Sequence, residues 1–225
     1  MKLFHVHLKS NVDVKLPEAV LKRLPKRLGI VTTIQHLHKI DDIVKQTKGV
    51  LAGQVLGCNA SQVEKVNDDI DAFLFVGSGE FHPINVALKT GKKVWLWNPI
   101  SKNFGLLDEK MIEKYRKQKQ GKLSKFLNAK RVGIIVSTKM GQKNLMRAYE
   151  LMKQSDREYY LFACDEVNFA EFENFNFIDF WVNTACPRIE DSRIIHIDDL
   201  IDAGLLKLKK GSYEVPIWKS DLGLH

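Results

Sequence analysis

The stretch KRLGIVTT at residues 26–33 returns, nearly unchanged, as KRVGIIVST at residues 130–138. Each copy is a short run of apolar and β-branched residues, which is typical of a buried strand. A second pair of similar segments, IDAFLFVGSG at 70–79 and IDFWVNTAC at 178–186, follows in the same order. A weak internal repeat of this kind predicts two lobes of similar design within one chain.

Short apolar runs alternate with polar stretches of helical pattern along most of the chain. The alternation predicts an α/β fold made of two similar small open parallel-sheet lobes, built from βαβ repeats with right-handed crossovers and facing a shared crevice. We expect strands at 27–33, 50–57, 72–77, 93–99, 131–137, 159–164, 177–183 and 193–197. The main intervening helices are expected at 35–46, 60–69, 84–89 and 142–153.

These elements divide the chain into four parts. Residues 1–10 form a leftover edge strand, 11–105 the first lobe, 106–130 a basic connecting helix and 131–225 the second lobe. Gly121 is a candidate break in the connecting helix. The lysines of that helix are expected to be a solvated face. The alternative is a docking surface for an acidic or RNA-bearing partner.

Composition excludes several classes of protein. The 225 residues include 35 Lys and Arg against 27 Asp and Glu, a net charge of +8 that permits nucleic-acid contact without requiring it. No apolar run approaches the roughly 18 residues of a membrane span, and the N-terminus does not have the pattern of a secretory signal. We therefore expect a cytoplasmic protein without membrane contact and without direct nucleic-acid binding. Three cysteines and no CxxC pair fit a reducing compartment.

Ligands of open parallel sheets bind beyond the carboxyl ends of the strands. Two segments are expected there, GSGEFH at 77–82 and STKMGQ at 137–142, each joining a strand to a helix. Backbone N–H groups in such a turn, together with a helix N-terminus, bind carboxylate or phosphate, and Lys139 adds a point charge. Neither segment has a Walker or GxGxxG pattern, so plain turns are the alternative reading.

The cysteines follow predicted strands as well. Cys58 and Cys164 end the second strand of each lobe, and Cys186 follows the third strand of the second lobe. A single free cysteine is usually a small buried apolar residue. Three thiols that converge on one crevice could instead hold an iron–sulfur cluster with one iron free for a substrate.

A set of motifs then makes a family resemblance visible. They are LGIVTTIQHLH (28–38), GQVLGCN (53–59), FVGSGEFHP (75–83), IVSTKMGQ (135–142) and VNTACPRI (182–189). Their order and spacing resemble the diphthamide synthase iron–sulfur family, the archaeal 2-(3-amino-3-carboxypropyl)histidine synthases, over about residues 25 to 190.

The resemblance implies a [4Fe-4S] cluster held by three cysteines, one from each of three similar α/β domains. It further implies that S-adenosylmethionine binds the unique iron and that its 3-amino-3-carboxypropyl group is transferred, as a radical, to a histidine of translation elongation factor 2. Carried over to this chain, Cys58 and Cys186 are cluster ligands. The expected S-adenosylmethionine crevice is lined by Gln35, His36, Gly77, Ser78, Gly79, Glu80, Ser137, Thr138, Lys139, Gly141 and Gln142.

The chain departs from the family at its start, where a first domain with the first cysteine is expected. Only KLFHVHL (2–8) resembles the last strand of that domain, and the alternation of His5 and His7 fits a half-buried strand better than a metal site. The missing ligand could come from a separate N-terminal-domain polypeptide or a homodimer mate. Alternatively, Cys164 replaces it as a third metal ligand.

Two functions from different classes remain at this point. One is a radical transferase acting as the C-terminal half of a split enzyme. The other is a noncatalytic accessory subunit that binds the enzyme or elongation factor 2 without building an active cluster. A generic basic nucleic-acid binder has only the net charge in its favour.

Overall fold

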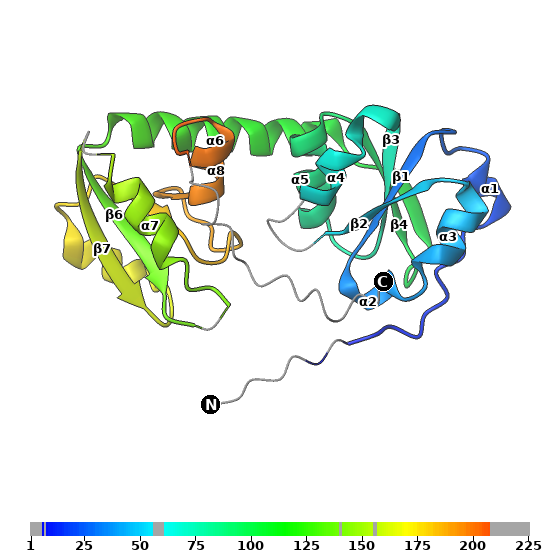
Figure 1. Ribbon diagram of the computed structural model, residues 1–225, viewed down its shortest axis with the longest axis horizontal. Coiled ribbons are helices and arrows are strands. Elements are labelled where there is room, and N and C mark those ends of the chain that lie inside the picture. The colour runs from blue at the N-terminus through cyan, green and yellow to red at the C-terminus, as the bar shows by residue number, and fades with distance from the viewer. Residues whose placement is uncertain (1–5, 7, 56–60, 140, 155–156, 208–225) are drawn as a thin grey trace. The chain divides into compact units, whose positions relative to one another are not determined.

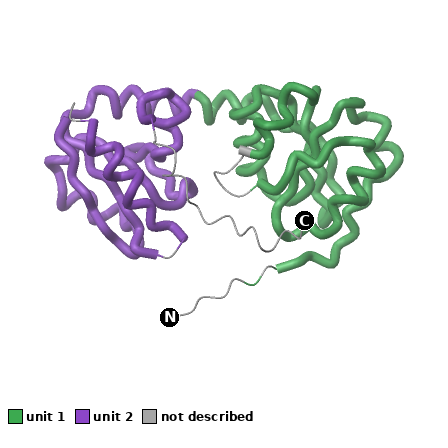
Figure 2. Tube along the Cα trace, viewed as in Figure 1, with its two compact units in different colours: residues 1–116 green, residues 117–225 purple. Residues whose placement is uncertain are grey.

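The structure is a computed structural model, and it describes residues 6, 8–55, 61–139, 141–154 and 157–207. The chain divides into two compact units, Met1–Arg116 and Lys117–His225 (Figure 2). Each unit contains one sheet with helices packed against it (Figure 1). The predicted α/β class with two parallel-dominated sheets is therefore confirmed.

The sheet of unit 1 has the strand order β2-β1-β3-β4-β5. Its strands are β1 (Leu28–Thr32), β2 (Val50–Gln54), β3 (Ala72–Val76), β4 (Lys93–Asn98) and β5 (Asn103–Leu106). The first four are parallel, as predicted, but β5 is antiparallel to β4 and was not expected. The Asn98 side chain accepts hydrogen bonds from the N–H groups of Ile100 and Ser101, and Lys102 takes a left-handed conformation, so the chain turns back on itself.

Helices cover both faces of this sheet. They are α1 (Glu18–Leu21), α2 (Ile34–Leu37), α3 (Ile40–Thr47), α4 (Ser61–Lys65), the 3-10 helix η1 (Asn67–Asp69) and α5 (Phe81–Thr90). Residues from α1 and α3 form a core on one face, and residues from α4 and α5 form a core on the other. The single helix predicted over 35–46 is in fact two, because Lys39 leaves the helical conformation.

The sheet of unit 2 has the order β7-β6-β8-β9, and every pair in it is parallel. Its strands are β6 (Arg131–Ser137), β7 (Glu158–Cys164), β8 (Phe180–Asn183) and β9 (Ile194–His196). The helices are α7 (Leu145–Met152), the 3-10 helix η2 (Phe169–Phe175) and α8 (Ile197–Asp202). The order equals that of the first four strands of unit 1, as the sequence repeat requires.

The repeat extends to the packing between neighbouring strands. A Cβ atom built on Gly29 would lie 2.7 Å from the ring of Phe73, and one built on Gly133 would lie 2.4 Å from the ring of Trp181. Gly29 pairs with Phe73 across β1 and β3, and Gly133 pairs with Trp181 across β6 and β8. In each unit the glycine therefore leaves space for an aromatic ring of the adjacent strand.

Helix α6 (Glu109–Asn128) begins in unit 1 and ends in unit 2. It is continuous, so the prediction of a break at Gly121 is wrong. A glycine in an exposed helix interior costs only about 1 kcal/mol. Apolar side chains on both sides of it offset that cost: Tyr115 packs against the core of unit 1 and Phe126 lies in the core of unit 2.

The segment before the first helix lies along unit 1. Val14 and Leu16 are buried, and the indole N–H of Trp97 donates to the Val14 carbonyl at 2.8 Å. Most of the edge strand predicted over 1–10 lies outside the described residues, while Val6 and Leu8 are exposed and not in a strand. None of the helices in the described ranges is long and apolar enough to cross a membrane.

Candidate functional site

The loop that carries Cys186 follows β8 in unit 2 and is fixed by the last residue of that strand. Asn183 is fully buried; its side-chain oxygen accepts from the N–H of Ala185, and its amide donates to the Cys186 carbonyl, both at 2.8 Å. The N–H of Ile189 donates to the same carbonyl at 3.0 Å. Two donors therefore hold the carbonyl of Cys186, while the side chain of this cysteine remains partly exposed.

The next residue, Thr184, joins this loop to neighbouring elements. Its hydroxyl and its N–H both donate to the carbonyl of Ile135 in β6, at 2.8 and 3.0 Å. Its own carbonyl accepts from the side-chain amide of Asn144, the N-cap residue of α7, at 2.7 Å. Thr184 is fully buried, so these bonds are shielded from water.

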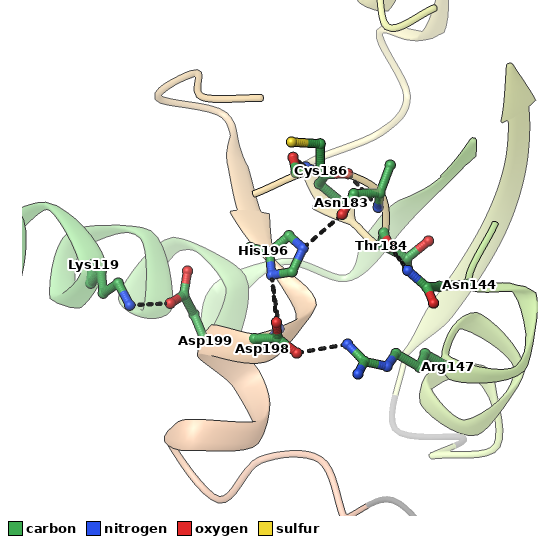
Figure 3. A network of polar contacts seen from close by, with 10 residues as sticks. Lys119, Asn144, Arg147, Asn183, Thr184, Cys186, His196, Asp198 and Asp199 are labelled. Atoms are coloured by element: carbon green, nitrogen blue, oxygen red, sulfur yellow. Dashed lines mark hydrogen bonds and ion pairs between the residues drawn. The ribbon is translucent and has the colours of Figure 1, made fainter. Parts of the chain in front are cut away.

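Behind the loop lies a chain of polar contacts through His196, Asp198 and Arg147 (Figure 3). The Nε2 atom of His196 is 3.0 Å from the carbonyl of Ala185, the residue before Cys186. The backbone N–H of Asp198 donates to His196 Nδ1, and the Arg147 guanidinium pairs with the Asp198 carboxylate at 2.7 Å. Arg147 is buried on α7, so the loop, α7 and α8 are linked by one network.

The predicted turn at 137–142 lies at the carboxyl end of β6. The Lys139 N–H donates to the Ser137 hydroxyl, and the Thr138 N–H donates to the Cys164 carbonyl. The Gln142 N–H donates to the Lys139 carbonyl at 3.1 Å, and Gly141 takes a left-handed φ of 81°.

This turn does not lead directly into a helix, because α7 begins only at Leu145. The segment still connects β6 to α7, but the helix begins three residues beyond it, and the predicted anion cradle stays a prediction. The Lys139 ammonium lies 3.1 Å from the carboxylate of Glu166, and both side chains are exposed. An exposed pair of this kind is weak, so another carboxylate can compete for the lysine.

Cys164 differs from Cys186 in its surroundings. It packs with Phe162 against a cluster of buried aromatic and aliphatic residues beneath η2. Burial raises the pKa of its thiol, and the carboxylates of Asp165 and Glu171 raise it further. These effects disfavour the thiolate that a metal requires. In the described part of the chain, no three His, Cys, Asp or Glu side chains are grouped so that they could hold a metal ion.

The corresponding edge of unit 1 carries the GSGEFH segment. Gly77 donates its N–H to the Trp97 carbonyl at 2.9 Å, and Gly79 has a left-handed φ of 79°. Helix α5 begins at Phe81, immediately after Glu80, so the predicted strand-to-helix turn is present here. Ser78, Gly79 and Glu80 are exposed, as a binding turn must be.

Gln35 and His36 lie in α2, just beyond β1 on the same edge of unit 1. His36 is 4% exposed, and its Nδ1 atom has no hydrogen-bond partner. Burial lowers the pKa of His36, and the nearby His38 and Lys39 lower it further, so the ring is neutral at pH 7. The predicted ligand Cys58 lies outside the described residues.

The predicted residues thus fall on the carboxyl edges of two sheets, one in each unit. Sequence reasoning missed Asn144, Arg147, His196 and Asp198, which hold the Cys186 loop in place. No local signal in the sequence indicated His196, because histidine is not among the residues that favour the N-cap position it takes before α8.

A family model described as "diphthamide synthesis protein" matches residues 1–193. The 2-(3-amino-3-carboxypropyl)histidine synthase of Pyrococcus horikoshii is 34% identical over 186 residues, which cover 75% of this chain and 52% of the relative. The synthase of Methanocaldococcus jannaschii is 33% identical, with 73% and 46% covered.

Comparison with solved structures also finds similarity to diphthamide synthesis proteins. The crystal structure of Dph2 from Pyrococcus horikoshii matches with a TM-score of 0.70 at 29% identity, covering 89% of this chain and 65% of that one. The structure of that protein with a 4Fe-4S cluster matches with a TM-score of 0.67 at 30% identity, covering 84% and 60%. The chain spans about half the length of the curated relatives it matches. The family match over 193 residues means that this chain belongs to the diphthamide synthesis protein family.

Proposed function

We propose that this chain acts in the first step of diphthamide synthesis. In that reaction, the 3-amino-3-carboxypropyl group of S-adenosylmethionine is transferred by a radical mechanism to a histidine of translation elongation factor 2. Support comes from the relatives named 2-(3-amino-3-carboxypropyl)histidine synthase and from the similar Dph2 structure that contains a 4Fe-4S cluster. The proposed compartment is the cytoplasm, with no membrane and no direct nucleic-acid contact.

The observation that carries the proposal is the construction of the Cys186 loop. Hydrogen bonds from Asn183 and Ile189 fix the backbone of this cysteine, yet its side chain stays partly exposed. A rigid backbone with an accessible thiol suits a cluster ligand, whereas a cysteine that only fills space is buried. Cys186 therefore fits a [4Fe-4S] cluster as the single ligand contributed by unit 2.

Cys164 fits that role less well, because its thiol packs in the aromatic cluster and its pKa is raised. We propose Cys58 as the ligand contributed by unit 1. When bound, a [4Fe-4S] cluster supplies single electrons and an iron atom with a free coordination position.

The other predicted residues would bind and orient S-adenosylmethionine. The exposed residues Ser78, Gly79 and Glu80 directly precede helix α5, and N–H groups at such a position favour a carboxylate. Lys139 could exchange its exposed partner Glu166 for the carboxylate of the substrate. The buried, neutral His36 has a ring nitrogen without a partner and could accept a hydrogen bond from the substrate.

We further propose that the chain works with a partner that completes the ligand set, either a separate polypeptide or a second copy of the chain. A relative in Schizosaccharomyces pombe, 23% identical over 215 residues, is named subunit 1 of the synthase, which indicates an assembly of several subunits in that organism. This chain spans about half of such relatives. A noncatalytic accessory role is the alternative, and the same experiment separates the two.

The test uses S-adenosylmethionine labelled either in its carboxyl carbon or in its methyl group. The full chain, with and without the candidate partner, is reconstituted anaerobically with ferrous iron and sulfide and incubated with elongation factor 2 and a reductant. The proposal predicts that carboxyl label enters elongation factor 2 and that methyl label does not, since the methyl group leaves with the sulfur. Cys186→Ala should abolish the transfer.

Transfer of the methyl label would mean ordinary methyltransferase chemistry and would contradict the proposal. If a Cys186→Ala chain supports the same carboxyl transfer as the parent, the accessory role is correct instead.

A further inference from the structure

We infer that His196, held by Asp198 and Arg147, is a positioning residue that fixes the Cys186 loop for cluster binding. The inference rests on the proposed role of Cys186 as a ligand. The family match ends at residue 193, so His196 and Asp198 lie beyond the part of the chain that it covers.

The contacts around His196 define the role of its Nε2 atom. The Ala185 carbonyl can only accept, so Nε2 carries a proton, while Nδ1 faces the N–H of Asp198 at 3.2 Å and the Asp198 carboxylate at 3.4 Å. Nε2 then donates to the Ala185 carbonyl at 3.0 Å, one residue before Cys186. The side chain of His196 is 9% exposed, so water cannot easily replace this donor.

The orientation of the ring is fixed from the opposite side. The Asp198 carboxylate receives the guanidinium of Arg147 at 2.7 Å, and the side chain of Arg147 is only 11% exposed. Asp198 belongs to the first turn of α8 and contacts the His196 ring. Arg147 belongs to α7 and holds Asp198 in place.

The loop has a second connection to α7, through the bond from Asn144 to the Thr184 carbonyl. Two successive carbonyls before Cys186, those of Thr184 and Ala185, are thus held by side chains from outside the loop. The donors come from 40 and 11 residues away in the sequence. Hydrogen bonds from outside the loop restrain its backbone, so the thiol of Cys186 keeps its position when the cluster is absent.

Two variants of His196 separate this role from a purely structural one. In His196→Asn the shorter amide can still accept from the Asp198 N–H and cap α8, but it cannot reach the Ala185 carbonyl. His196→Gln is the reverse, because its longer side chain can donate to that carbonyl while the cap is lost. Arg131→Ala is the matched control, since it breaks an ion pair with Asp179 in the same unit, at the other end of the sheet.

The measurement is the reaction rate of Cys186 with a disulfide reagent in the full-length chain, with Cys58→Ser and Cys164→Ser as background so that Cys186 is the only thiol. His196→Asn should raise this rate about fivefold, the factor expected for one lost hydrogen bond that had restrained the loop. His196→Gln and Arg131→Ala should stay within twofold of the parent, and His196→Gln should lower the thermal midpoint.

A second readout is the iron that the chain with all its cysteines, together with the partner if the parent chain requires one, retains after anaerobic reconstitution with ferrous iron and sulfide. His196→Asn should retain less iron than His196→Gln, and Cys186→Ala should set the lower limit. If Cys186→Ala retains as much iron as the parent, the proposed ligand role fails. If Cys186→Ala loses iron while His196→Asn matches the parent in both thiol rate and iron, the positioning role is overturned and the ligand role stands.

Discussion

Units 1 and 2 are alike at the amino ends of their strands and unlike at the carboxyl ends. At the amino ends, Asp71 donates its N–H to the Arg27 carbonyl and pairs with the Arg27 side chain. Asp179 does the same with Arg131, and its ion pair has a length of 3.1 Å. The two units also share the glycine that faces an aromatic ring of the next strand.

At the carboxyl ends the same register positions carry different groups. Ser78 of unit 1 lies five residues after Phe73, and Cys186 of unit 2 lies five residues after Trp181. Ser78 is exposed in a glycine-rich turn before α5, whereas no helix directly follows the loop of Cys186. The loop of unit 2 is instead held by side chains from α7 and β9. The comparison indicates that the strands and their amino ends determine the shared fold, while the carboxyl edge is free to acquire chemistry.

The largest effect on stability is expected when the space that each glycine leaves beside an aromatic ring is filled. Gly133→Ala would place a methyl group 2.4 Å from Trp181, and Gly29→Ala would place one 2.7 Å from Phe73. Both rings are buried, so we expect each change to lower the free energy of unfolding by about 1–3 kcal/mol. Gly133→Ala should cost at least as much as Gly29→Ala, as measured by urea denaturation.

A smaller side chain in place of Trp181 tests whether the clash with its ring causes the loss of stability in Gly133→Ala. Trp181→Leu alone should destabilise unit 2, but combined with Gly133→Ala the two losses should be less than additive. Gly105→Ala is the control, because a Cβ there meets no atom within 4 Å. Strictly additive losses would mean that the glycine is needed for another reason.

The two Arg–Asp pairs should both contribute a pH-dependent stabilisation, because each arginine lowers the pKa of its aspartate. In the folded chain the pKa of Asp179 lies below its ordinary value of 3.8, first because the Arg131 N–H donates to it and then because the Arg131 guanidinium does. A lowered carboxyl pKa stabilises the fold at pH values above 3.8, and this contribution is lost as the pH falls through the folded-state pKa.

Asp179→Asn should therefore cost about 1 kcal/mol at pH 7, a value that allows for solvent screening of this half-exposed group. The difference between variant and parent should shrink as the pH drops below 3.8. Asp71→Asn should cost less, because the pair in unit 1 is more exposed. A constant difference across an acid titration of stability would exclude ionisation of Asp179 as the cause.

Substitution of Lys139 or Glu166 should have the smallest effect on stability. Either alanine variant should change the free energy of unfolding by less than about 0.5 kcal/mol, because both side chains are exposed. Binding of S-adenosylmethionine should respond in opposite directions: Lys139→Ala weakens it, and Glu166→Ala strengthens it by removing the competing carboxylate. Calorimetric titration of the reconstituted chain measures both, and equal affinities would exclude Lys139 from the site.

Much of the fold could be predicted from the sequence, because its strands are short runs of apolar, aromatic and β-branched residues bounded by polar ones. The eight strands expected within the two lobes are all present, and the two similar lobes that the repeat predicts share the order of their first four strands. Strand β5 could not be found in this way. Asn98 and Pro99 do mark a turn, but the left-handed Lys102, after which the chain returns as an antiparallel strand, is not indicated by its residue type.

The site was only partly accessible to sequence reasoning, for a different physical reason. Cys186 and the exposed turn at 77–80 lie directly after strands, where the topology of a parallel sheet brings ligands. The residues that hold Cys186 are brought to it by packing, since Arg147 and Asp198 are 51 residues apart. No local pattern encodes a contact at such a distance. The raised pKa of the Cys164 thiol likewise follows from tertiary burial.

The contrast between the two cysteines of unit 2 gives the most direct test of this account. Cys164→Ala and Cys186→Ala are each reconstituted anaerobically, together with the partner if the parent chain requires one, and their iron and acid-labile sulfide are measured against the parent. The account predicts that Cys164→Ala keeps the iron and sulfide of the parent and that Cys186→Ala loses most of it. Loss in Cys164→Ala with retention in Cys186→Ala would contradict it and would make Cys164 the ligand.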